Sequence, residues 1–284
     1  MDLVPAAWLL DHIDDPDLRL ADVRWYLLEP DRGRAEYATG HLPGAVFVDL
    51  ATVLSDPVGS GPGRHPLPSP ARFVAELGAL GFGSGHRIVA YDEGGGLNAA
   101  RLWWMLDQLG HPRPAVLDGG VAAWQAAGGA LTATVPSWPP AELRLGDRWR
   151  ETIDRDELRA RLGRVVLLDA RAAARYRGET EPIDPVAGHI PTARSLPSTD
   201  LLAPDGSLLA ADALRARFAA VGADGDQSVV VSCGSGITAA HLALAMRSLG
   251  LPDPILYEGS YSDWSRSGLP VATGPEPGSA DLAR

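Results

Sequence analysis

The stretch that decides the fold reads Val229-Val230-Val231-Ser232-Cys233-Gly234-Ser235-Gly236-Ile237-Thr238. Its apolar start predicts a buried parallel strand, and the apolar stripe from Thr238 to Leu249 predicts a helix that Gly250 can cap. Between strand and helix, two glycines allow the backbone to turn tightly and to direct its amide groups inward. In sheets built from such units, ligands bind beyond the carboxyl ends of the strands, so this loop is the first candidate site.

The same landmarks occur twice along the chain, and in three of the pairs the second copy lies 140 positions after the first. A register kept over so many positions predicts a duplicated domain. Each copy alternates strands with helices, which is typical of an α/β fold with helices on both faces of a parallel sheet. The pairs are Leu20–Arg24 with Leu167–Arg171, Gly40–Pro43 with Gly188–Pro191, Asn98–Arg101 with Thr238–His241, Asp118–Gly120 with Glu258–Ser260, and Trp124 with Trp264.

The expected organisation is therefore two tandem domains, at residues 1–131 and 151–272. Residues 132–150 contain three prolines and two tryptophans, so they are too proline-broken for a helix and too aromatic for a free linker. We expect this segment to pack on the surface as a connecting strap. Glycine and proline recur from Thr273 onward, which predicts a flexible tail at 273–284.

Composition and charge limit the classes of function. The 284 residues are 45% hydrophobic and 21% charged, which fits a folded globular protein. The formal net charge of −11 and the lack of an arginine- or lysine-rich run argue against nucleic acid or a membrane surface as a partner. The sequence starts without the pattern of a signal peptide, and no apolar run reaches the ~18 residues of a membrane span. We expect a cytoplasmic protein.

Cys233 is the only cysteine, so an internal disulfide is excluded, and cysteine and histidine pairs at zinc spacing are absent. We expect neither a metal nor another cofactor. A lone cysteine is most often a small buried hydrophobe. This one heads a glycine-rich loop before a helix, where convergent amide groups and the positive end of the helix favour a thiolate. Cys233 is therefore predicted to be a nucleophile.

These stretches resemble the motifs of the rhodanese superfamily, and the resemblance covers the chain up to about residue 272. The cysteine loop is similar to the active-site loop of 3-mercaptopyruvate sulfurtransferases. Trp25 lies in a stretch that resembles one whose aromatic ring covers the active site in two-domain members. The matching stretches are Cys233–Ala239 for the active-site loop, Gly40–Ala45 and Gly188–Pro191 for the first signature, Glu258–Trp264 for the second, and Asp22–Tyr26 for the aromatic segment.

The resemblance implies a sulfurtransferase with a persulfide intermediate. The thiolate of Cys233 would take sulfur from 3-mercaptopyruvate and pass it to a thiol or to cyanide. Because there is no second cysteine, the acceptor must come from outside, such as thioredoxin or a small thiol. Asp92 holds the corresponding position of the first copy and cannot carry sulfane sulfur, so that copy is expected to be catalytically silent.

Two catalytic partners of the cysteine also follow from the resemblance. Ser235 and His65 match a serine and a histidine that act around the cysteine in 3-mercaptopyruvate sulfurtransferases. The matching acid position holds Ala51, with Asp49 two residues earlier, so the acid stays unassigned. The alternative for His65 is an ordinary surface histidine.

The substrate-binding candidates are three arginines, four residues of the cysteine loop and Trp25. The arginines follow a predicted strand at 165–169, where a guanidinium can bind a carboxylate through two hydrogen bonds, although a solvated charge run is the alternative. Arg175 resembles the substrate-binding arginine of the family, whereas a second family arginine is replaced by Asp184. The candidates are Arg171, Arg175, Arg177, Gly234, Gly236, Ile237, Thr238 and Trp25.

Three other functions compete with this prediction. Thiosulfate is the alternative sulfur donor, but loops that favour it carry basic side chains after the cysteine, where this loop has glycine and serine. A cysteine phosphatase needs an arginine six positions beyond the cysteine, and Ala239 stands there. A rhodanese-like binding or regulatory module fits a copy that holds Asp92, but not the copy with Cys233.

Overall fold

The computed structural model describes residues 1–225 and 227–283, which form two compact units. Compared with the expected continuous ranges, one short segment of each half is assigned to the other unit. No helix in the described part of the chain is long and apolar enough to cross a membrane. The first unit comprises Met1–Asp56, Pro68–Arg150 and Leu202–Leu208, and the second comprises Pro57–Leu67, Glu151–Leu201 and Leu209–Arg284.

The first unit is built on a parallel sheet of five strands in the order β1-β5-β4-β2-β3. Its central strands are buried along nearly their whole length, as is typical of a parallel sheet that is covered on both faces. The strands are β1 (Leu3–Val4), β2 (Leu18–Asp22), β3 (Ala45–Phe47), β4 (Arg87–Tyr91) and β5 (Pro114–Leu117).

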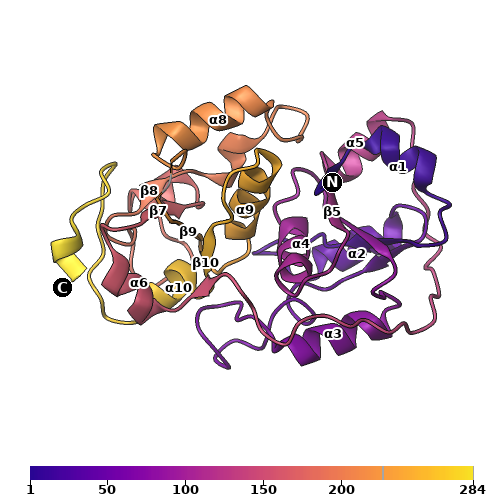
Figure 1. The fold of residues 1–284 in the computed structure, drawn as a ribbon, viewed down its shortest axis with the longest axis horizontal. Coiled ribbons are helices and arrows are strands. Elements are labelled where there is room, and N and C mark those ends of the chain that lie inside the picture. The colour runs from indigo at the N-terminus through magenta and orange to yellow at the C-terminus, as the bar shows by residue number, and fades with distance from the viewer. Residues whose placement is uncertain (226, 284) are drawn as a thin grey trace. The chain divides into compact units, whose positions relative to one another are not determined.

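Helices cover both faces of this sheet (Figure 1). They are α1 (Ala6–His12), α2 (Arg32–Thr39), α3 (Pro70–Ala79), α4 (Ala99–Gln108) and α5 (Gly120–Ala126). On β4, Val89 and Tyr91 pack in one core cluster with residues of α1 and α5. Ile88 and Ala90 alternate to the opposite face. Helix α4 contacts β4 and β5 and follows the loop that begins with Asp92.

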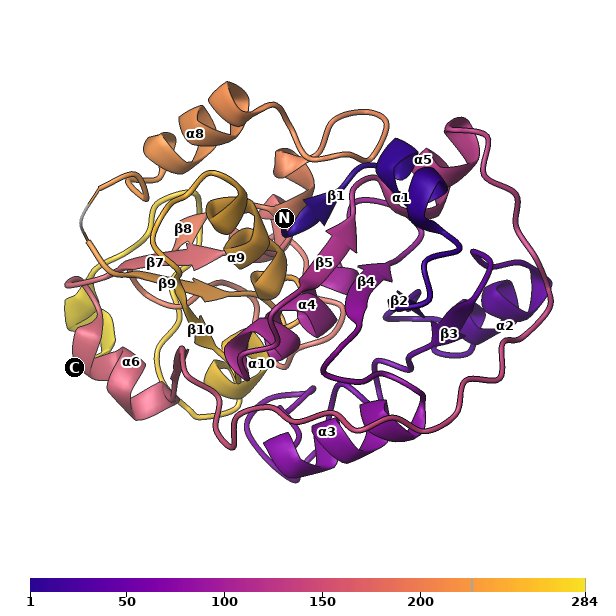
Figure 2. The ribbon, with the colours of Figure 1, turned by 45° about the vertical axis from the view of Figure 1, so that its right-hand side comes forward.

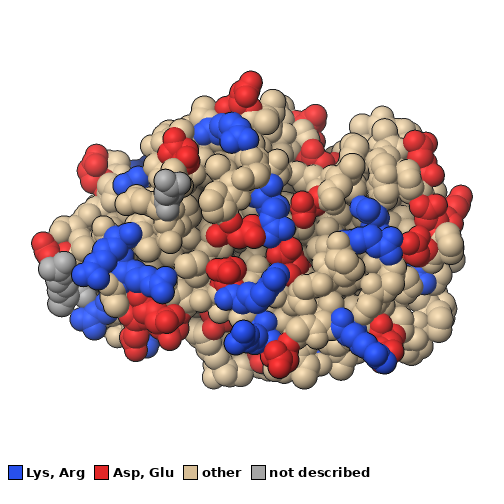
Figure 3. Space-filling model, in the orientation of Figure 1, with Lys and Arg blue, Asp and Glu red and all other residues tan. Residues whose placement is uncertain are grey.

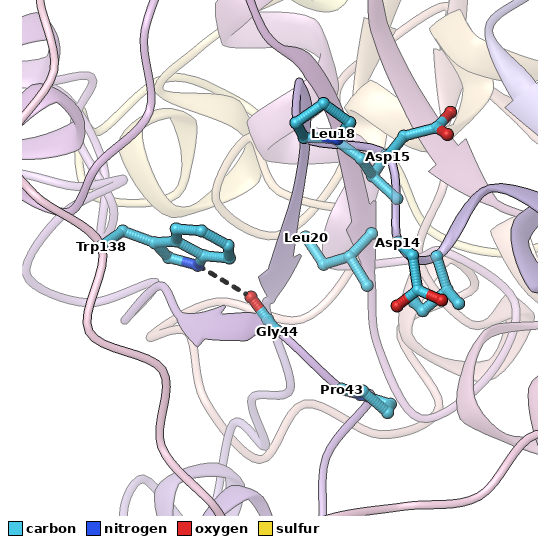
Figure 4. Close-up of a pocket in the computed structure, with 9 residues that line it drawn as sticks. Asp14, Asp15, Leu18, Leu20, Pro43, Gly44 and Trp138 are labelled. Atoms are coloured by element: carbon cyan, nitrogen blue, oxygen red, sulfur yellow. Dashed lines mark hydrogen bonds between the residues drawn. The ribbon is translucent and has the colours of Figure 1, made fainter.

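Residues 133–149, within the expected strap, form neither helix nor strand and pack on the first unit through their tryptophans. The Trp149 ring stacks on Trp104, with centroids 6.0 Å apart. Trp138 Nε1 donates a hydrogen bond to the carbonyl of Gly44 at 3.1 Å. Figure 4 shows this contact at the wall of a pocket that Asp14 and Asp15 also line. Aromatic anchoring thus fixes an irregular segment that has no regular backbone ladder of its own.

The second unit repeats the architecture. Its parallel sheet has five strands in the order β6-β10-β9-β7-β8, which is the order of the first sheet. The predicted strand at 229–232 is confirmed as β9, the central strand. The strands are β6 (Thr152–Ile153), β7 (Val166–Asp169), β8 (Arg194–Ser195), β9 (Val229–Ser232) and β10 (Ile255–Tyr257).

The helices of the second unit are α6 (Arg155–Arg161), α7 (Ala173–Tyr176), α8 (Ala211–Ala220), α9 (Ala239–Ser248) and α10 (Ser260–Trp264), with 3₁₀ turns η1 (Ser198–Leu201) and η2 (Ala280–Ala283). Val230 packs with residues of α6 and α10 on one face. Figure 2 shows α8 on the opposite side of the sheet. The predicted α/β fold, with two parallel sheets that each have helices on both faces, is confirmed.

The region from Thr273 onward makes backbone contacts with the second unit. The N–H of Thr192 donates to the carbonyl of Pro277 at 2.6 Å, and His189 Nε2 lies 3.1 Å from the carbonyl of Glu276. These bonds hold the first part of the expected tail against the loop before β8. The last residue, Arg284, lies outside the described residues, and so does Asp226 in the expected second domain.

Charged side chains of both signs lie on the face of the molecule that Figure 3 shows. On that face, basic and acidic groups are interspersed, apart from a small group of adjoining basic side chains at the left of the view. Many charged side chains of the described residues form ion pairs, for example Arg247 with Asp253 at 2.6 Å.

Candidate active site

Cys233 follows the last residue of β9, at the carboxyl end of that strand, and heads the loop that leads to α9. The residue is only 2% exposed. Its Sγ accepts hydrogen bonds from the backbone N–H groups of Gly236, at 3.1 Å, and Ser235, at 3.4 Å. Gly236 adopts a φ of 80°, in the left-handed region that favours glycine. The loop therefore surrounds the sulfur with donors that suit an anion.

Three hydrogen bonds tie this loop to α10. The N–H of Cys233 donates to Ser260 Oγ at 3.1 Å, and the N–H of Tyr261 donates to the carbonyl of Cys233 at 3.0 Å. The N–H of Ser262 donates to the carbonyl of the residue after the cysteine at 2.9 Å. Ser260 has a φ of 51°, a conformation that is uncommon outside glycine and that the surrounding contacts must hold. The stretch Glu258–Trp264 thus positions the backbone of the cysteine loop.

His65 is brought to the same loop by the segment Pro57–Leu67, which belongs to the second unit although it lies in the first half of the chain. His65 Nδ1 lies 2.7 Å from Ser235 Oγ, and both side chains are buried. The imidazole tautomer decides which of the two groups donates. Because the N–H of Ser235 also donates to Sγ, the three predicted catalytic residues are joined by consecutive hydrogen bonds.

A close backbone approach lets this segment reach the loop. Gly63 has a φ of 74°, and a Cβ atom at this position would stand 2.5 Å from the carbonyl oxygen of Gly259. The next residue, Arg64, donates its N–H to Ser262 Oγ at 2.9 Å. Both the backbone conformation and the space therefore require glycine at position 63.

Arg175, on α7, lies beside the cysteine loop. Its Nη1 is 3.6 Å from the place that a Cβ of Gly234 would occupy. Glu181 accepts from Arg175 Nη2 at 2.7 Å and from Nε at 3.2 Å, and Asp184 accepts from Nη2 at 3.2 Å. Burial acts to raise the pKa of Glu181, but hydrogen bonds from Arg175 and from backbone N–H groups hold it below its usual range. The ion pair therefore persists in mildly acidic solution.

Asp184 joins Arg175 to two further arginines. Its buried carboxylate lies 2.7 Å from Arg64 Nη1 and 3.2 Å from Arg266 Nη1. The atom closest to a Cβ built on Gly234 is Arg64 Nη2, at 3.2 Å. Arg64 is a residue that the motifs do not single out, and its one signal in the sequence is its place directly before His65.

Arg171 is buried and held by protein partners, and its substrate role stays a prediction. Its guanidinium is 1% exposed and donates to both oxygens of Asp169 and, at 2.7 Å, to the carbonyl of Gly188. Arg24 binds Asp22 through the same two nitrogens in the first unit. This Asp-x-Arg pair is a structural element of both sheets, and its repetition in the two copies is the sequence signal for that role.

Arg177 is also engaged elsewhere. It follows α7 and donates Nε and Nη2 to the two oxygens of Glu179 at 2.7 and 2.8 Å, in an exposed pair. These contacts correspond to the solvated charge run that is the alternative for this arginine. At the end of the cysteine loop, Ile237 is 4% exposed, and the carbonyl of Thr238 accepts from Ser198 Oγ at 3.1 Å.

Two residues considered for the site belong to the first unit. The carbonyl of Trp25 accepts from Asn98 Nδ2 at 3.0 Å, in a pocket that Asp92 also lines. Asp49 accepts from the N–H of Ala51 at 2.9 Å and pairs with Arg34 at 3.0 Å, so its oxygens are used locally. The described residues contain no cluster of three or more histidine, cysteine or acidic side chains that could hold a metal ion.

Asp92 fills the place of the cysteine in the first unit and is buried like it. Its Oδ1 accepts from the N–H groups of Gly94 and Gly96, and its Oδ2 from those of Asn98 and Ala99, at 2.8 to 3.2 Å. Burial raises the pKa of Asp92 to about 6, although these four bonds act to lower it. A carboxylate thus occupies an amide-lined loop like the one that holds the thiol in the second unit.

We expect Asp92→Asn to leave kcat within a few-fold of wild type while it changes the pH dependence of stability. Folding raises the pKa of Asp92 from 3.8 to about 6. The protonated side chain therefore adds to the free energy of unfolding, in full at pH values below 3.8, and this addition is lost as the pH rises through about 6. At about 1.4 kcal/mol per pKa unit, the loss is roughly 3 kcal/mol. Chemical unfolding from pH 4 to pH 7 should show this decline in wild type and not in the variant. A severe loss of kcat in a stable variant would instead give the first unit a part in the chemistry.

Comparison with known proteins gives the same family for both halves. The sequence profile of the rhodanese-like domain matches residues 5–127 and again residues 154–267. The chain is 46% identical over 280 residues to a Pseudomonas aeruginosa protein with the provisional name 3-mercaptopyruvate sulfurtransferase, which covers 96% of this chain and 98% of that protein. It is 42% identical over 271 residues to a Mycobacterium tuberculosis protein with the provisional name thiosulfate sulfurtransferase SseB, which covers 93% of each.

A solved structure agrees with these relatives. The crystal structure of SseA from Escherichia coli, described among 3-mercaptopyruvate sulfotransferases of rhodanese fold, superposes with a TM-score of 0.80 at 35% sequence identity. The match covers 92% of this chain and 98% of that one. The likeness therefore extends over both units rather than over one repeated domain.

Proposed function

The chain belongs to the rhodanese family of sulfurtransferases, and from this premise we propose that it carries sulfur from 3-mercaptopyruvate to a thiol or to cyanide as a persulfide of Cys233. One observation carries the proposal. The Sγ of the only cysteine accepts two backbone N–H groups at the carboxyl end of the central strand. Such donors stabilise a thiolate before sulfur transfer and the persulfide anion that forms after it.

In the first half-reaction, the Cys233 thiolate attacks the sulfur of 3-mercaptopyruvate. An S–S bond forms and the C–S bond breaks, and the electron pair of that bond stays on carbon as the enolate of pyruvate. The enolate then takes up one proton to give pyruvate. We assign the delivery of this proton to Ser235 and His65, because their 2.7 Å contact can relay a proton next to the sulfur.

In the second half-reaction, an acceptor thiolate attacks the outer sulfur of the persulfide. The S–S bond breaks, Cys233 leaves as a thiolate, and the acceptor departs as a persulfide. With cyanide the same step releases thiocyanate. Since the chain has one cysteine, the acceptor is an external group, and we propose thioredoxin or a small thiol in the cytoplasm, where thiols are kept reduced.

The choice of donor rests on how the negative charge is distributed in each candidate. 3-Mercaptopyruvate has its carboxylate at one end and its sulfur at the other, so Arg175 can hold the carboxylate while the loop amides face the sulfur. In thiosulfate both charges lie within one small ion beside the cysteine. There the loop offers the dipoles of Ser235 and the glycines but no side-chain cation of its own.

We therefore expect a larger kcat/KM for 3-mercaptopyruvate than for thiosulfate. Steady-state assays with both donors and one common acceptor, under identical conditions, measure the ratio directly. A larger value for thiosulfate would make this protein a thiosulfate sulfurtransferase. Lack of turnover with either donor, together with an unmodified Cys233 by mass spectrometry, would favour a binding or regulatory module.

A further inference from the structure

Ser260, the first residue of α10, adopts a backbone conformation that glycine adopts in the first unit. Its φ is 51°, in the left-handed region where residues with a Cβ atom are uncommon. Its counterpart 140 positions earlier, Gly120, is the first residue of α5 and has a φ of 55°, which costs glycine nothing. In each unit the N–H of the next residue donates at 3.0 Å to the loop, to the carbonyl of Cys233 or of Asp92. The turn is therefore built without a serine side chain in one copy.

The Ser260 hydroxyl joins the ends of two paired strands, β9 and β10. It donates to the carbonyl of Tyr257, the last residue of β10, at 2.9 Å. Because its one hydrogen is used there, its oxygen accepts the N–H of Cys233, directly after β9, at 3.1 Å. Ser260 is fully buried, so water does not compete for either bond. The main chain of the predicted nucleophile is thus fixed from the neighbouring strand.

The thiol has fewer bonds to its loop than the carboxylate at the same place in the first unit. The two oxygens of Asp92 accept four backbone N–H groups. Among the described residues, Cys233 Sγ accepts only two, at 3.1 and 3.4 Å, and sulfur is a weak acceptor. The side chain of Cys233 therefore constrains its loop less than Asp92 does. The bond from the Cys233 N–H to Ser260 supplies a further constraint in the copy that needs one.

We propose that Ser260 is a positioning residue for sulfur transfer. Its hydroxyl fixes the main chain of Cys233, so that Sγ stays directed at the N–H groups of Ser235 and Gly236. The strained φ of Ser260 is the conformational cost of this hydrogen bond, since glycine would relieve the strain but lacks the hydroxyl. The effect on turnover rests on the proposed function. The hold on the sulfur itself can be measured by alkylation of Cys233, without any sulfur transfer.

Two substitutions remove the same hydroxyl but differ in backbone strain. Ser260→Gly relieves the strained φ, whereas Ser260→Ala retains it, so the glycine variant should have the higher melting temperature of the two. Both should react with iodoacetamide roughly two- to tenfold more slowly than wild type, the factor expected for one neutral hydrogen bond. The rate of Cys233 modification at a fixed pH, followed by intact-protein mass spectrometry, measures this effect. Reactivity should therefore follow the hydroxyl, and stability should follow the backbone.

Steady-state kinetics give a second measurement on the same proteins. The value of kcat/KM for 3-mercaptopyruvate should fall by about the same factor in both variants. The inhibition constant of pyruvate should stay within about twofold of wild type, because neither change removes a predicted contact with the donor. Ser265→Ala is the matched control. It removes another buried serine hydroxyl, directly after α10, that has no hydrogen-bond partner among the described residues, and its rates should equal those of wild type.

The pair of variants separates positioning from stability. A loss of reactivity that is large in Ser260→Ala and absent in Ser260→Gly would overturn the proposal and leave Ser260 a role in folding alone. Alkylation of both variants at the wild-type rate would overturn it as well. Absent turnover in wild-type protein, together with slower alkylation of both variants, would overturn the proposed donor and retain the positioning role.

Discussion

Replacing Cys233 by serine is expected to abolish turnover with every donor and to leave no sulfur adduct on the protein. A serine hydroxyl is not ionised near neutral pH and cannot hold sulfane sulfur, while the two amide donors at Gly236 and Ser235 stay in place. Wild-type protein incubated with 3-mercaptopyruvate should gain the mass of one sulfur atom, measured by intact-protein mass spectrometry. Dithiothreitol should then remove it.

The control for this variant is its fold. Serine is smaller and more polar than cysteine, so the buried site loses some packing, and the melting temperature should fall only slightly. Turnover that survives in the folded serine variant would contradict the persulfide mechanism. A sulfur adduct that persists on the serine variant would show that another residue carries the sulfur.

Arg175→Ala is expected to lower kcat/KM for 3-mercaptopyruvate by roughly 10- to 150-fold. Removal of a charged hydrogen-bond partner costs about 1.5 to 3 kcal/mol, and each 1.4 kcal/mol or so is a factor of ten. The effect should be smaller for thiosulfate, because that donor has no carboxylate at a distance from its sulfur. Steady-state assays with both donors, combined with unfolding curves, separate lost binding from lost stability.

The matched control is Arg177→Ala, two residues along the chain. Arg177 has the same charge but pairs at the surface with Glu179. Its loss should leave kcat/KM for both donors close to wild type. If Arg175→Ala behaves like this control, Arg175 does not bind the donor; an equal loss with both donors would point to disturbance of Glu181 and Asp184 instead.

Local pattern predicts the central strands β4 and β9, because each is rich in apolar residues and is followed by a loop and a helix. Residues 229–232 form β9 as expected, and the helix expected from Thr238 to Leu249 is α9, Ala239–Ser248, with those two residues as its caps. Because the sequence landmarks recur in the second half, the same architecture is expected there, and the two sheets do share one strand order.

The side-chain partners were harder to predict, because they join positions far apart in the sequence. Arg64 and Asp184 form an ion pair although 120 positions separate them, and no periodicity links them. Arg171 shows the opposite difficulty. Its place after a strand suggests a site at the sheet edge, but Asp169, two residues earlier, captures its guanidinium. Sequence position alone does not distinguish an arginine that binds a ligand from one that forms an ion pair with a nearby acid of the same loop.

The assignment of Pro57–Leu67 to the second unit has a consequence for the history of this chain. His65 and Arg64 are encoded before the boundary between the two copies, whereas Cys233 is encoded after it. A gene fragment for the second copy alone would therefore lack His65, which is part of the proposed catalytic machinery, and its neighbour Arg64. A deletion of the first copy would remove both residues, although that copy has Asp92 where the second has Cys233. The segment that completes the second unit is therefore encoded within the first copy, so the two copies cannot be separated at the level of the gene without loss of the proposed His65–Ser235 contact.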